Sequence, residues 1–430
     1  MLLAGEGIVD ITPPLGIELA GFHKPLGRER RVAGARKPAF VRALVLKVNE
    51  SALAILQLDM LAVSPEFSRR VQQRAEAESG IPAAHVRVCA THTHGMPTFR
   101  ALRQWGAISP DYMASVEAKC IEALKQAVAD LSEADCYIGA DRVKGGNFNR
   151  TSKVWKTDEA FDANATDSDR WLDTMLHALF FQRADNKTPI LWYHFCAHPV
   201  CYQDELAGPD WPALVAEGIQ ASGAPNPGFL QGHIGDVNPG DGSKWIGEAR
   251  PTATAILPAL HHAATHGEMV RIDEIRVQTR EIEIPFDVQR LRDEIAFYKA
   301  HPEECTKGIW VDEGFAKAWY AEVSTWTSPP ESYKAAVSTV QLGELGMLFH
   351  PSELYSYYGL KIRHASPFPN TLVVGYCEDF IGYLTDPRAY DDNEYAAVVV
   401  PKLCSMPPFE EEASRIFTDI CIEQLKSMAS

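Results

Sequence analysis

The chain has 430 residues, of which 46% are hydrophobic and 23% are charged, an ordinary composition for a globular protein. These values exclude intrinsic disorder, a collagen-like repeat and a coiled coil as its main organisation. The 57 acidic residues outnumber the 41 basic ones, and the formal charge of −16 repels nucleic-acid phosphates and anionic membrane surfaces. Nucleic acid is therefore not expected as a partner.

Short apolar runs alternate with longer amphipathic segments, which predicts an α/β fold. No linker rich in Gly, Pro or Ser divides the chain, so we expect one large domain over residues 1–430. In it, a layered mixed β-sheet is flanked by helices, and residues 287–335 form a helical insertion. Strands are predicted at residues 43–48, 52–58, 86–90, 190–195, 272–284, 338–349 and 371–375. Helices are predicted at 67–77, 110–131, 170–183, 212–221, 252–265, 287–300, 352–363 and 409–427.

Membrane and disulfide signals are weak in this sequence. No apolar stretch reaches the roughly 20 residues of a membrane-spanning helix, and the N-terminus lacks a secretory apolar core. We therefore expect a cytoplasmic protein without a transmembrane segment. The nine cysteines are odd in number and form no CxxC pair, which favours reduced core cysteines over a disulfide scaffold or a structural zinc site.

Common motifs of serine hydrolases, nucleotide-binding proteins and zincins are missing, because the chain has no GxSxG, P-loop, HExxH or complete GxGxxG. Histidines instead follow predicted strands. His92 and His94 come just after the strand at 86–90, and two residues of a continuing strand would point their imidazoles to one side. This pair predicts a functional site, the alternative being two surface histidines in a loop.

A second histidine group follows the predicted strand at 190–195. His198 precedes a proline, where the backbone is extended, and is the better candidate ligand, whereas His194 also fits a hydrogen-bonded core histidine. Cys196 and Cys201 are interpreted as packing residues, since water-activating metal sites more often use nitrogen and oxygen ligands.

Four further groups of residues have simple structural explanations. The Gly-rich segment 231–240 fits a turn as well as a site, with Asp236 embedded in it. Glu353 fits a carboxylate in the first turn of a helix that Ser352 caps. His261, His262 and His266 fit a solvated helix face or C-terminus, and Trp310, Trp319, Tyr320 and Trp326 fit either a core or an apolar groove.

Taken in order, several of these segments resemble the motifs of the neutral (alkaline, non-lysosomal) ceramidases. Residues 90–94, ATHTH, resemble that family's ATHTHSGP signature, and residues 195–199, FCAHP, resemble its Phe-Ala-Val-His-Pro. The other similar segments are 7–14 (GIVDITPP), 20–22 (AGF), 146–150 (GNFNR), 235–239 (GDVNP), 351–353 (PSE) and 382–390 (GYLTDPRAY), followed by Tyr395. The resemblance extends over almost the whole chain, and we expect the catalytic domain of the family without its C-terminal β-sandwich.

The resemblance implies a zinc-dependent hydrolase that cleaves an N-acyl amide by attack of metal-bound water. Carried over position by position, it implies that the Zn²⁺ ligands are His92, His198, Glu353 and Tyr383. It likewise implies that His94, Arg150 and Tyr395 line the scissile group as catalytic residues. The expected partner is a small-molecule or N-acyl substrate.

Two positions depart from the family's pattern. Gly95 and Met96 stand in the signature where the family continues Ser-Gly, and Asn238 replaces the serine after Gly-Asp-Val. Asparagine cannot act as a nucleophile, so a serine mechanism at this position is excluded and the substrate need not be ceramide. The alternatives are an esterase or lactonase on the same site, another hydrolase of a polar metabolite, or a non-catalytic metal-binding protein.

Overall fold

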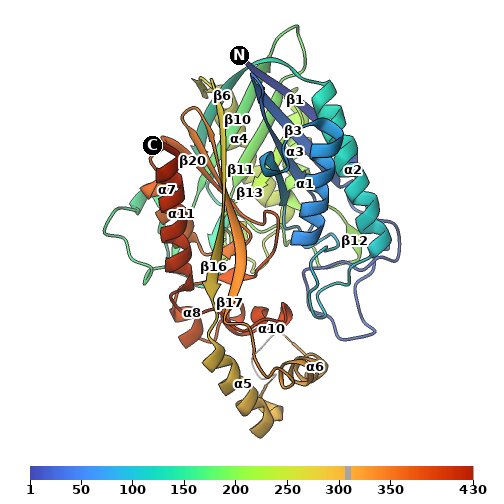
Figure 1. The fold of residues 1–430 in the computed structure, drawn as a ribbon, viewed down its shortest axis with the longest axis vertical. Coiled ribbons are helices and arrows are strands. Elements are labelled where there is room, and N and C mark those ends of the chain that lie inside the picture. The colour runs from blue at the N-terminus through green and yellow to red at the C-terminus, as the bar shows by residue number, and fades with distance from the viewer. Residues whose placement is uncertain (306–310, 430) are drawn as a thin grey trace.

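Two stacked β-sheets form the centre of the molecule in the computed structural model, which describes residues 1–305 and 311–429 (Figure 1). The larger, nine-stranded sheet is mixed, with parallel pairs at both edges and antiparallel pairs between them. Its strand order is β13 (Gly228–Gln231), β11 (Ile190–Phe195), β10 (Met175–Arg183), β6 (Ser132–Arg142), β1 (Leu2–Asp10), β3 (Phe40–Val48), β4 (Ser51–Leu58) and β5 (Val86–Ala90), with β15 (Glu268–Val270) beside β6.

The smaller sheet has four strands, in the order β16 (Ile275–Pro285), β17 (Ser332–Leu342), β18 (Leu345–Phe349) and β20 (Asn370–Val374). Four short strand pairs lie outside both sheets, at the loops. They are β2 (Gly34–Ala35) with β12 (Leu206–Ala207), β7 (Asn147–Asn149) with β14 (Val237–Pro239), β8 (Lys156–Thr157) with β9 (Trp171–Leu172), and β19 (Glu353–Leu354) with β21 (Tyr383–Leu384).

Helices cover the outer face of each sheet, so the layers run helix, sheet, sheet, helix (Figure 1). Helices α1 (Pro65–Ser79), α2 (Pro110–Ala129), α3 (Trp211–Ala221) and α4 (Ala249–Thr265) pack on the larger sheet, and α7 (Ser356–Ala365) and α11 (Ala413–Ala429) on the smaller one. The remaining helices are α5 (Val288–Ala300), α6 (Glu313–Val323), α8 (Arg388–Asp391), α9 (Tyr395–Val398), α10 (Val400–Leu403) and the 3₁₀ turns η1 (Ala83–His85), η2 (Asp158–Ala160) and η3 (Pro302–Glu304).

Alternation along the strands builds the two main cores. On β3, Val41, Ala43 and Val45 face the helices, while Leu44 and Leu46 face the smaller sheet. Leu44 and Leu46 pack between the two sheets in one core with Val340 of β17. A period of two therefore explains why β3 reads as an almost continuous apolar run. The predicted α/β fold with a mixed sheet flanked by helices is confirmed.

The predicted helix at 170–183 is wrong, because this segment forms β9 and β10. The run Met175–Arg183 pairs along its whole length with β6 on one side, and residues 177–181 pair with β11 on the other. Short apolar runs do not separate strand from helix by periodicity, and here the pairing decided. Strands β1 and β6, at the middle of the sheet, were not predicted at all.

The predicted strand at 338–349 is two strands, since Gly343 turns the chain with a φ of +58°. The segment 287–335 holds α5 and α6 between β16 and β17, at one end of the molecule (Figure 1). There Trp319, Tyr320 and Trp326 pack with Leu291 and Tyr298 as a separate small core. Trp310 lies outside the described residues. Within the described ranges, no helix is long and apolar enough to cross a membrane.

Candidate metal centre

His92 occupies a strained turn directly after β5. The strand ends at Ala90, and His92 has a φ of +61°, a left-handed conformation that is uncommon for a residue other than glycine and clusters at functional sites. The strand therefore does not continue through His94, although the two imidazoles do converge as predicted for a continuing strand. The turn sends the His92 ring inward, where its Nδ1 lies 2.9 Å from the Leu61 carbonyl oxygen.

His198 reaches the same point from the end of β11. Its Nδ1 lies 2.7 Å from the Val237 carbonyl oxygen, and the residue is fully buried, at 0% exposure. The rings of His92 and His198 are 5.2 Å apart between centroids. Two histidines separated by more than one hundred residues in the sequence thus face each other.

Gln231 explains this convergence. Its Nε2 donates to the carbonyl oxygens of Thr91 and Ala197, each at 3.1 Å, and these residues directly precede His92 and His198. Gln231 ends β13 at one edge of the larger sheet, whereas Thr91 follows β5 at the opposite edge. The sheet must therefore curl until its edges approach each other, and one buried amide holds the two histidine turns together.

Glu353 and Tyr383 come from the short parallel pair β19–β21, in which they are register partners. The Glu353 Oε2 lies 3.3 Å from His92 Nε2 and 3.2 Å from His198 Nε2. The interpretation of Glu353 as a helix-dipole carboxylate is wrong, because α7 begins only at Ser356 and strand pairing with β21 takes the preceding residues out of the helix.

The third imidazole belongs to His94. Its Nδ1 lies 2.8 Å from the Gly21 carbonyl oxygen, and its Nε2 lies 3.4 Å from His92 Nε2. The ring also packs edge-on against Phe22. Ligand atoms of His92, His94 and His198 all lie within 4.8 Å of one another, which is close enough for one ion.

The proton arrangement at these rings indicates a cation site. A carbonyl oxygen only accepts, so the Nδ1 of each of the three histidines must carry the hydrogen. In a neutral imidazole the Nε2 then presents a lone pair. The lone pairs of His92 and His198 converge on the Glu353 carboxylate oxygen without a hydrogen between them, a repulsive arrangement that a divalent cation relieves, and the lone pair of His94 lies beside them. Histidines held through Nδ1 by backbone carbonyls are also typical of metal ligands. The donor set fits a zinc ion, which favours imidazole nitrogen and carboxylate oxygen.

Electrostatics at the centre favour the neutral forms of His94 and His198 and the ionised form of Glu353. Burial, with His92 and His198 beside it, holds the pKa of His94 well below its usual range. Burial and Arg150 lower the pKa of His198 to about 4. Burial alone would raise the pKa of Glu353, but His92 and His198 outweigh it and hold this pKa below the ordinary value.

Arg150 lies beside this centre, directly after β7. Its Nη2 donates to the Tyr383 hydroxyl at 2.7 Å and to the Gly235 carbonyl oxygen at 2.8 Å. Its Nη1 donates to Asn238 Oδ1 at 3.2 Å. Burial opposes the charge of Arg150, yet Tyr383 and Glu353 raise its pKa above the ordinary value. Asn238, the departure from the family's serine, therefore positions the guanidinium group.

Tyr383 and Tyr395 complete the predicted set. Burial raises the pKa of Tyr383 despite the nearby Arg150, and the hydroxyl hydrogen-bonds the Glu353 carboxylate. The ring of Tyr395, at the start of α9, meets the ring of Tyr383 edge-on at 6.3 Å. The structure thus brings all seven predicted residues into one neighbourhood, from six different segments of the chain, since His92 and His94 share the loop after β5.

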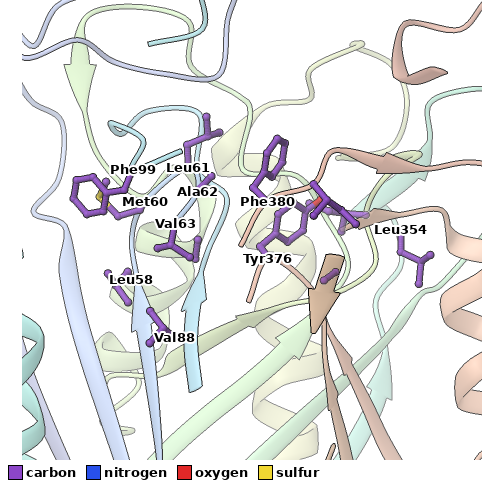
Figure 2. Close-up of a cluster of buried hydrophobic side chains, with 14 of the residues drawn as sticks. Leu58, Met60, Leu61, Ala62, Val63, Val88, Phe99, Leu354, Tyr376 and Phe380 are labelled. Atoms are coloured by element: carbon purple, nitrogen blue, oxygen red, sulfur yellow. The ribbon is translucent and has the colours of Figure 1, made fainter. Parts of the chain in front are cut away.

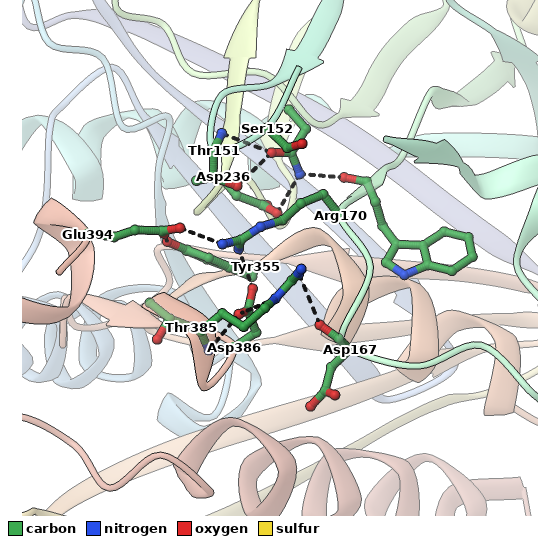
Figure 3. A network of polar contacts seen from close by, with 12 residues as sticks. Thr151, Ser152, Asp167, Arg170, Asp236, Tyr355, Thr385, Asp386 and Glu394 are labelled. Atoms are coloured by element: carbon green, nitrogen blue, oxygen red, sulfur yellow. Dashed lines mark hydrogen bonds and ion pairs between the residues drawn. The ribbon is translucent and has the colours of Figure 1, made fainter. Parts of the chain in front are cut away.

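A buried polar network fixes the loops that carry these tyrosines (Figure 3). Arg170 pairs with Asp386, three residues after Tyr383, and with Glu394, the residue before Tyr395. Tyr355 donates its hydroxyl to Glu394 Oε2 at 2.6 Å. Removing the arginine would leave Asp386 with only Arg388 and Glu394 with only the Tyr355 hydroxyl, so Arg170 ties together the loops that carry both tyrosines.

Tyr376 is the site residue that the sequence did not reveal. Its ring stacks on His92 with 4.1 Å between centroids, and its hydroxyl donates to Glu353 Oε2 at 3.4 Å. With Phe380 and Leu354 it lies near Leu61 and Ala62 in the apolar surroundings of the centre (Figure 2). The only available signal was its place just after the strand at 371–375.

The other candidate histidines and cysteines have structural roles. His194 Nε2 lies 2.9 Å from the Val373 carbonyl oxygen, as expected of a core histidine. His262 and His266 stack on each other at the exposed end of α4. Asp173, Cys196 and His233 form a second group with ligand spacing, but Arg363 already pairs with the Asp173 carboxylate at 2.7 Å.

Asp236 turns out to be structural. It accepts hydrogen bonds from the backbone N–H of Ser356 and from Asn149 Nδ2, both at 2.7 Å, so it joins the start of α7 to the loop of Arg150.

Comparison with known proteins agrees with this architecture. Residues 2–207 match the family described as neutral/alkaline non-lysosomal ceramidase, N-terminal. The family match and the fold support a hydrolase of the ceramidase-like class. The resemblance predicted from the motifs is therefore confirmed.

Among solved structures, the fold is similar to that of neutral ceramidase from Pseudomonas aeruginosa, with a TM-score of 0.75 and 16% identity over 99% of this chain and 74% of that chain. It is equally similar to a ceramidase complexed with C2, with a TM-score of 0.75 and 15% identity over 100% of this chain and 75% of that chain. At these identities the likeness shows the fold alone. No curated protein sequence matches the chain.

Proposed function

We propose that the chain is a zinc-dependent hydrolase that cleaves an N-acyl amide bond. The observation that carries this proposal is the convergence of three carbonyl-anchored imidazoles and the Glu353 carboxylate on one point, with Arg150 beside it. The ligands are His92, His198, Glu353 and Tyr383. When bound, zinc supplies a Lewis acid that activates water near neutral pH and polarises a carbonyl group.

The residues around the ligands have complementary roles in this proposal. Arg150, held by Asn238 and the Gly235 carbonyl, offers a fixed positive charge to the oxyanion that forms when the amide carbonyl is attacked. Tyr395, whose ring packs against Tyr383, provides a second donor through its hydroxyl. His94 is held neutral by burial, and its Nε2 faces the centre, so it can take a proton and deliver it to the leaving amine.

Amide cleavage suits this set because the leaving amine must be protonated as it departs. An ester or lactone needs no such proton donor, so His94 favours the amide. The substrate is an N-acyl compound that need not be ceramide, because Asn238 binds Arg150 where the family has serine.

The test combines metal analysis with turnover. Protein purified without added metal is expected to hold one zinc per chain, and a chelator is expected to abolish hydrolysis of fluorogenic N-acyl amides until zinc is returned. His198→Ala is expected to lose zinc and activity while its circular dichroism spectrum is unchanged. His262→Ala, on the exposed end of α4, is the matched control. Failure to bind zinc when it is offered, or zinc binding by His198→Ala equal to that of the parent, contradicts the proposal.

A further inference from the structure

Cys89 and Cys377 face each other in an isolated antiparallel bridge between the end of β5 and the loop after β20. The Glu378 N–H donates to the Val88 carbonyl at 2.8 Å, and the Ala90 N–H donates to the Tyr376 carbonyl at 3.0 Å. These bonds flank the two cysteines, which are therefore the non-hydrogen-bonded pair of the ladder. The Cα atoms of such a pair are about 4.5 Å apart, within the range of disulfides.

The side chains point directly at each other. The two Sγ atoms lie 2.9 Å apart, and both residues are buried. A disulfide bond is about 2.0 Å long, so a small rotation of the side chains would bring the sulfurs together without moving the backbone. The other cysteines are free as well, and no other cysteine pair of the described chain is in hydrogen-bond contact.

One member of this pair borders a surface pocket, which is the route by which a small reagent would approach. Cys377 lines a surface pocket of about 530 Å³, together with Gln72 of α1 and Ala335 of β17. Burial and the neighbouring Cys89 raise the pKa of the Cys377 thiol, so thiolate is scarce at neutral pH and exchange in the folded protein is slow.

The cysteine pair also adjoins the metal centre. Cys89 lies three residues before His92, and Cys377 follows Tyr376, which stacks on His92 and donates to Glu353. Both Tyr376 and Glu378 have left-handed backbones, with φ of +60° and +67°. A covalent bond at Cys377 would fix this strained loop, and with it Tyr376, against β5.

We propose that Cys89 and Cys377 form a disulfide bond that clamps Tyr376 onto the metal-binding turn. The oxidant is a low-molecular-weight disulfide. The Cys377 thiolate attacks one of its sulfurs, breaks the S–S bond and releases the first thiol. The Cys89 thiolate then attacks Cys377 Sγ in the mixed disulfide and releases the second thiol. The protein loses two electrons and two protons, and the reagent gains them.

The bond is tested by mass spectrometry of the full-length protein, incubated for hours with oxidised glutathione, alkylated under denaturing conditions and digested with trypsin. Each cysteine falls in a tryptic peptide with no other cysteine, residues 88–100 and 364–388. The expected product is these two peptides joined, with a mass equal to their sum less two hydrogens, absent from Cys89→Ala and Cys377→Ala and retained in the control Cys120→Ala. Alkylated free thiols at both positions of the parent would overturn the proposal.

The effect of the disulfide on the metal-binding turn is tested by the rate at which zinc passes from the protein to a chromogenic chelator. This measurement rests on the proposed function, whereas the detection of the joined peptides does not. Reduction of the oxidised parent is expected to speed zinc release roughly tenfold, the scale of effects from groups behind the ligands. It is expected to leave the rate unchanged in the Cys89→Ala/Cys377→Ala variant. Equal rates in the oxidised and reduced parent would overturn the clamp.

Discussion

At the scale of single residues, a substitution of Arg150 can distinguish zinc binding from catalytic turnover. Its guanidinium bonds Tyr383, Gly235 and Asn238 but none of the histidines. We expect Arg150→Ala to keep its zinc and to lower kcat about 10²–10³-fold, the usual effect of removing one oxyanion donor. Stopped assays with an N-acyl amide measure kcat, and Arg74→Ala on the exposed side of α1 serves as control. An unchanged kcat would remove Arg150 from the reaction.

Gln231 is expected to control metal affinity without touching the metal. Gln231→Leu leaves the Thr91 and Ala197 carbonyls without their donor and frees the two histidine turns. Zinc affinity should fall about 10–100-fold, as for other groups that hold ligands in place. Competition with a chelator of known affinity measures the change.

The matched control for Gln231 is Gln57→Leu. Gln57 is also a buried glutamine of the larger sheet, but it bonds Asp59 and Phe229 instead of the histidine turns. Both variants should lose about 1–3 kcal/mol of stability from unsatisfied buried groups, and only Gln231→Leu should lose zinc affinity. Equal zinc affinity in the two variants would show that Gln231 is merely structural.

At the scale of elements, the helices of the larger sheet lie so close that some strand positions admit only glycine. A Cβ on Gly139 of β6 would lie 1.9 Å from the Ala263 carbonyl oxygen of α4. The nearest obstacle is backbone, which cannot rotate away. We expect Gly139→Ala to lower the free energy of unfolding by about 1–3 kcal/mol, as in other overpacked cores.

Urea denaturation measures this difference, with Gly34→Ala as control. A Cβ on Gly34 would meet only the Leu206 Cδ2 methyl, at 3.3 Å, and that side chain can move. Equal stability of the Gly139→Ala variant and the parent would mean that α4 sits further from the sheet than the structure has it.

At the scale of the whole molecule, buried histidines behind the metal centre should set the acid limit of stability. Burial lowers the pKa of His177 to about 3, of His194 to about 4 and of His350 to about 3. These groups are neutral in the folded state but titrate near 6.5 in the unfolded chain. As the pH falls below about 6.5, only the unfolded state gains protons, and stability is lost down to the folded pKa values.

Each of these histidines contributes up to about 1.4 kcal/mol per pH unit to that loss. His177→Gln should therefore reduce the slope of the free energy of unfolding against pH by the contribution of one proton, between pH about 6 and about 4. Urea denaturation of the metal-free protein across this range measures the slope. A slope identical to that of the parent would mean that His177 is protonated in the folded state.

The sequence by itself determined the α/β class, most helices and the motifs of the site. These features depend on local apolar periodicity, on capping residues and on short sequence motifs, which can be read without knowing the tertiary structure. His92, His94 and His198 stood out since each follows an apolar run. The role of Glu353 came only from the resemblance.

Tertiary structure decided the rest. The segment 170–183 is a strand because β6 and β11 pair with it on both sides, and Glu353 leaves the helix because β21 pairs with it. The curl of the larger sheet, the Gln231 bridge and the stacking of Tyr376 on His92 join residues far apart in the chain. No local pattern encodes such contacts, since their free energy arises only when the two sheets and their covering helices pack together.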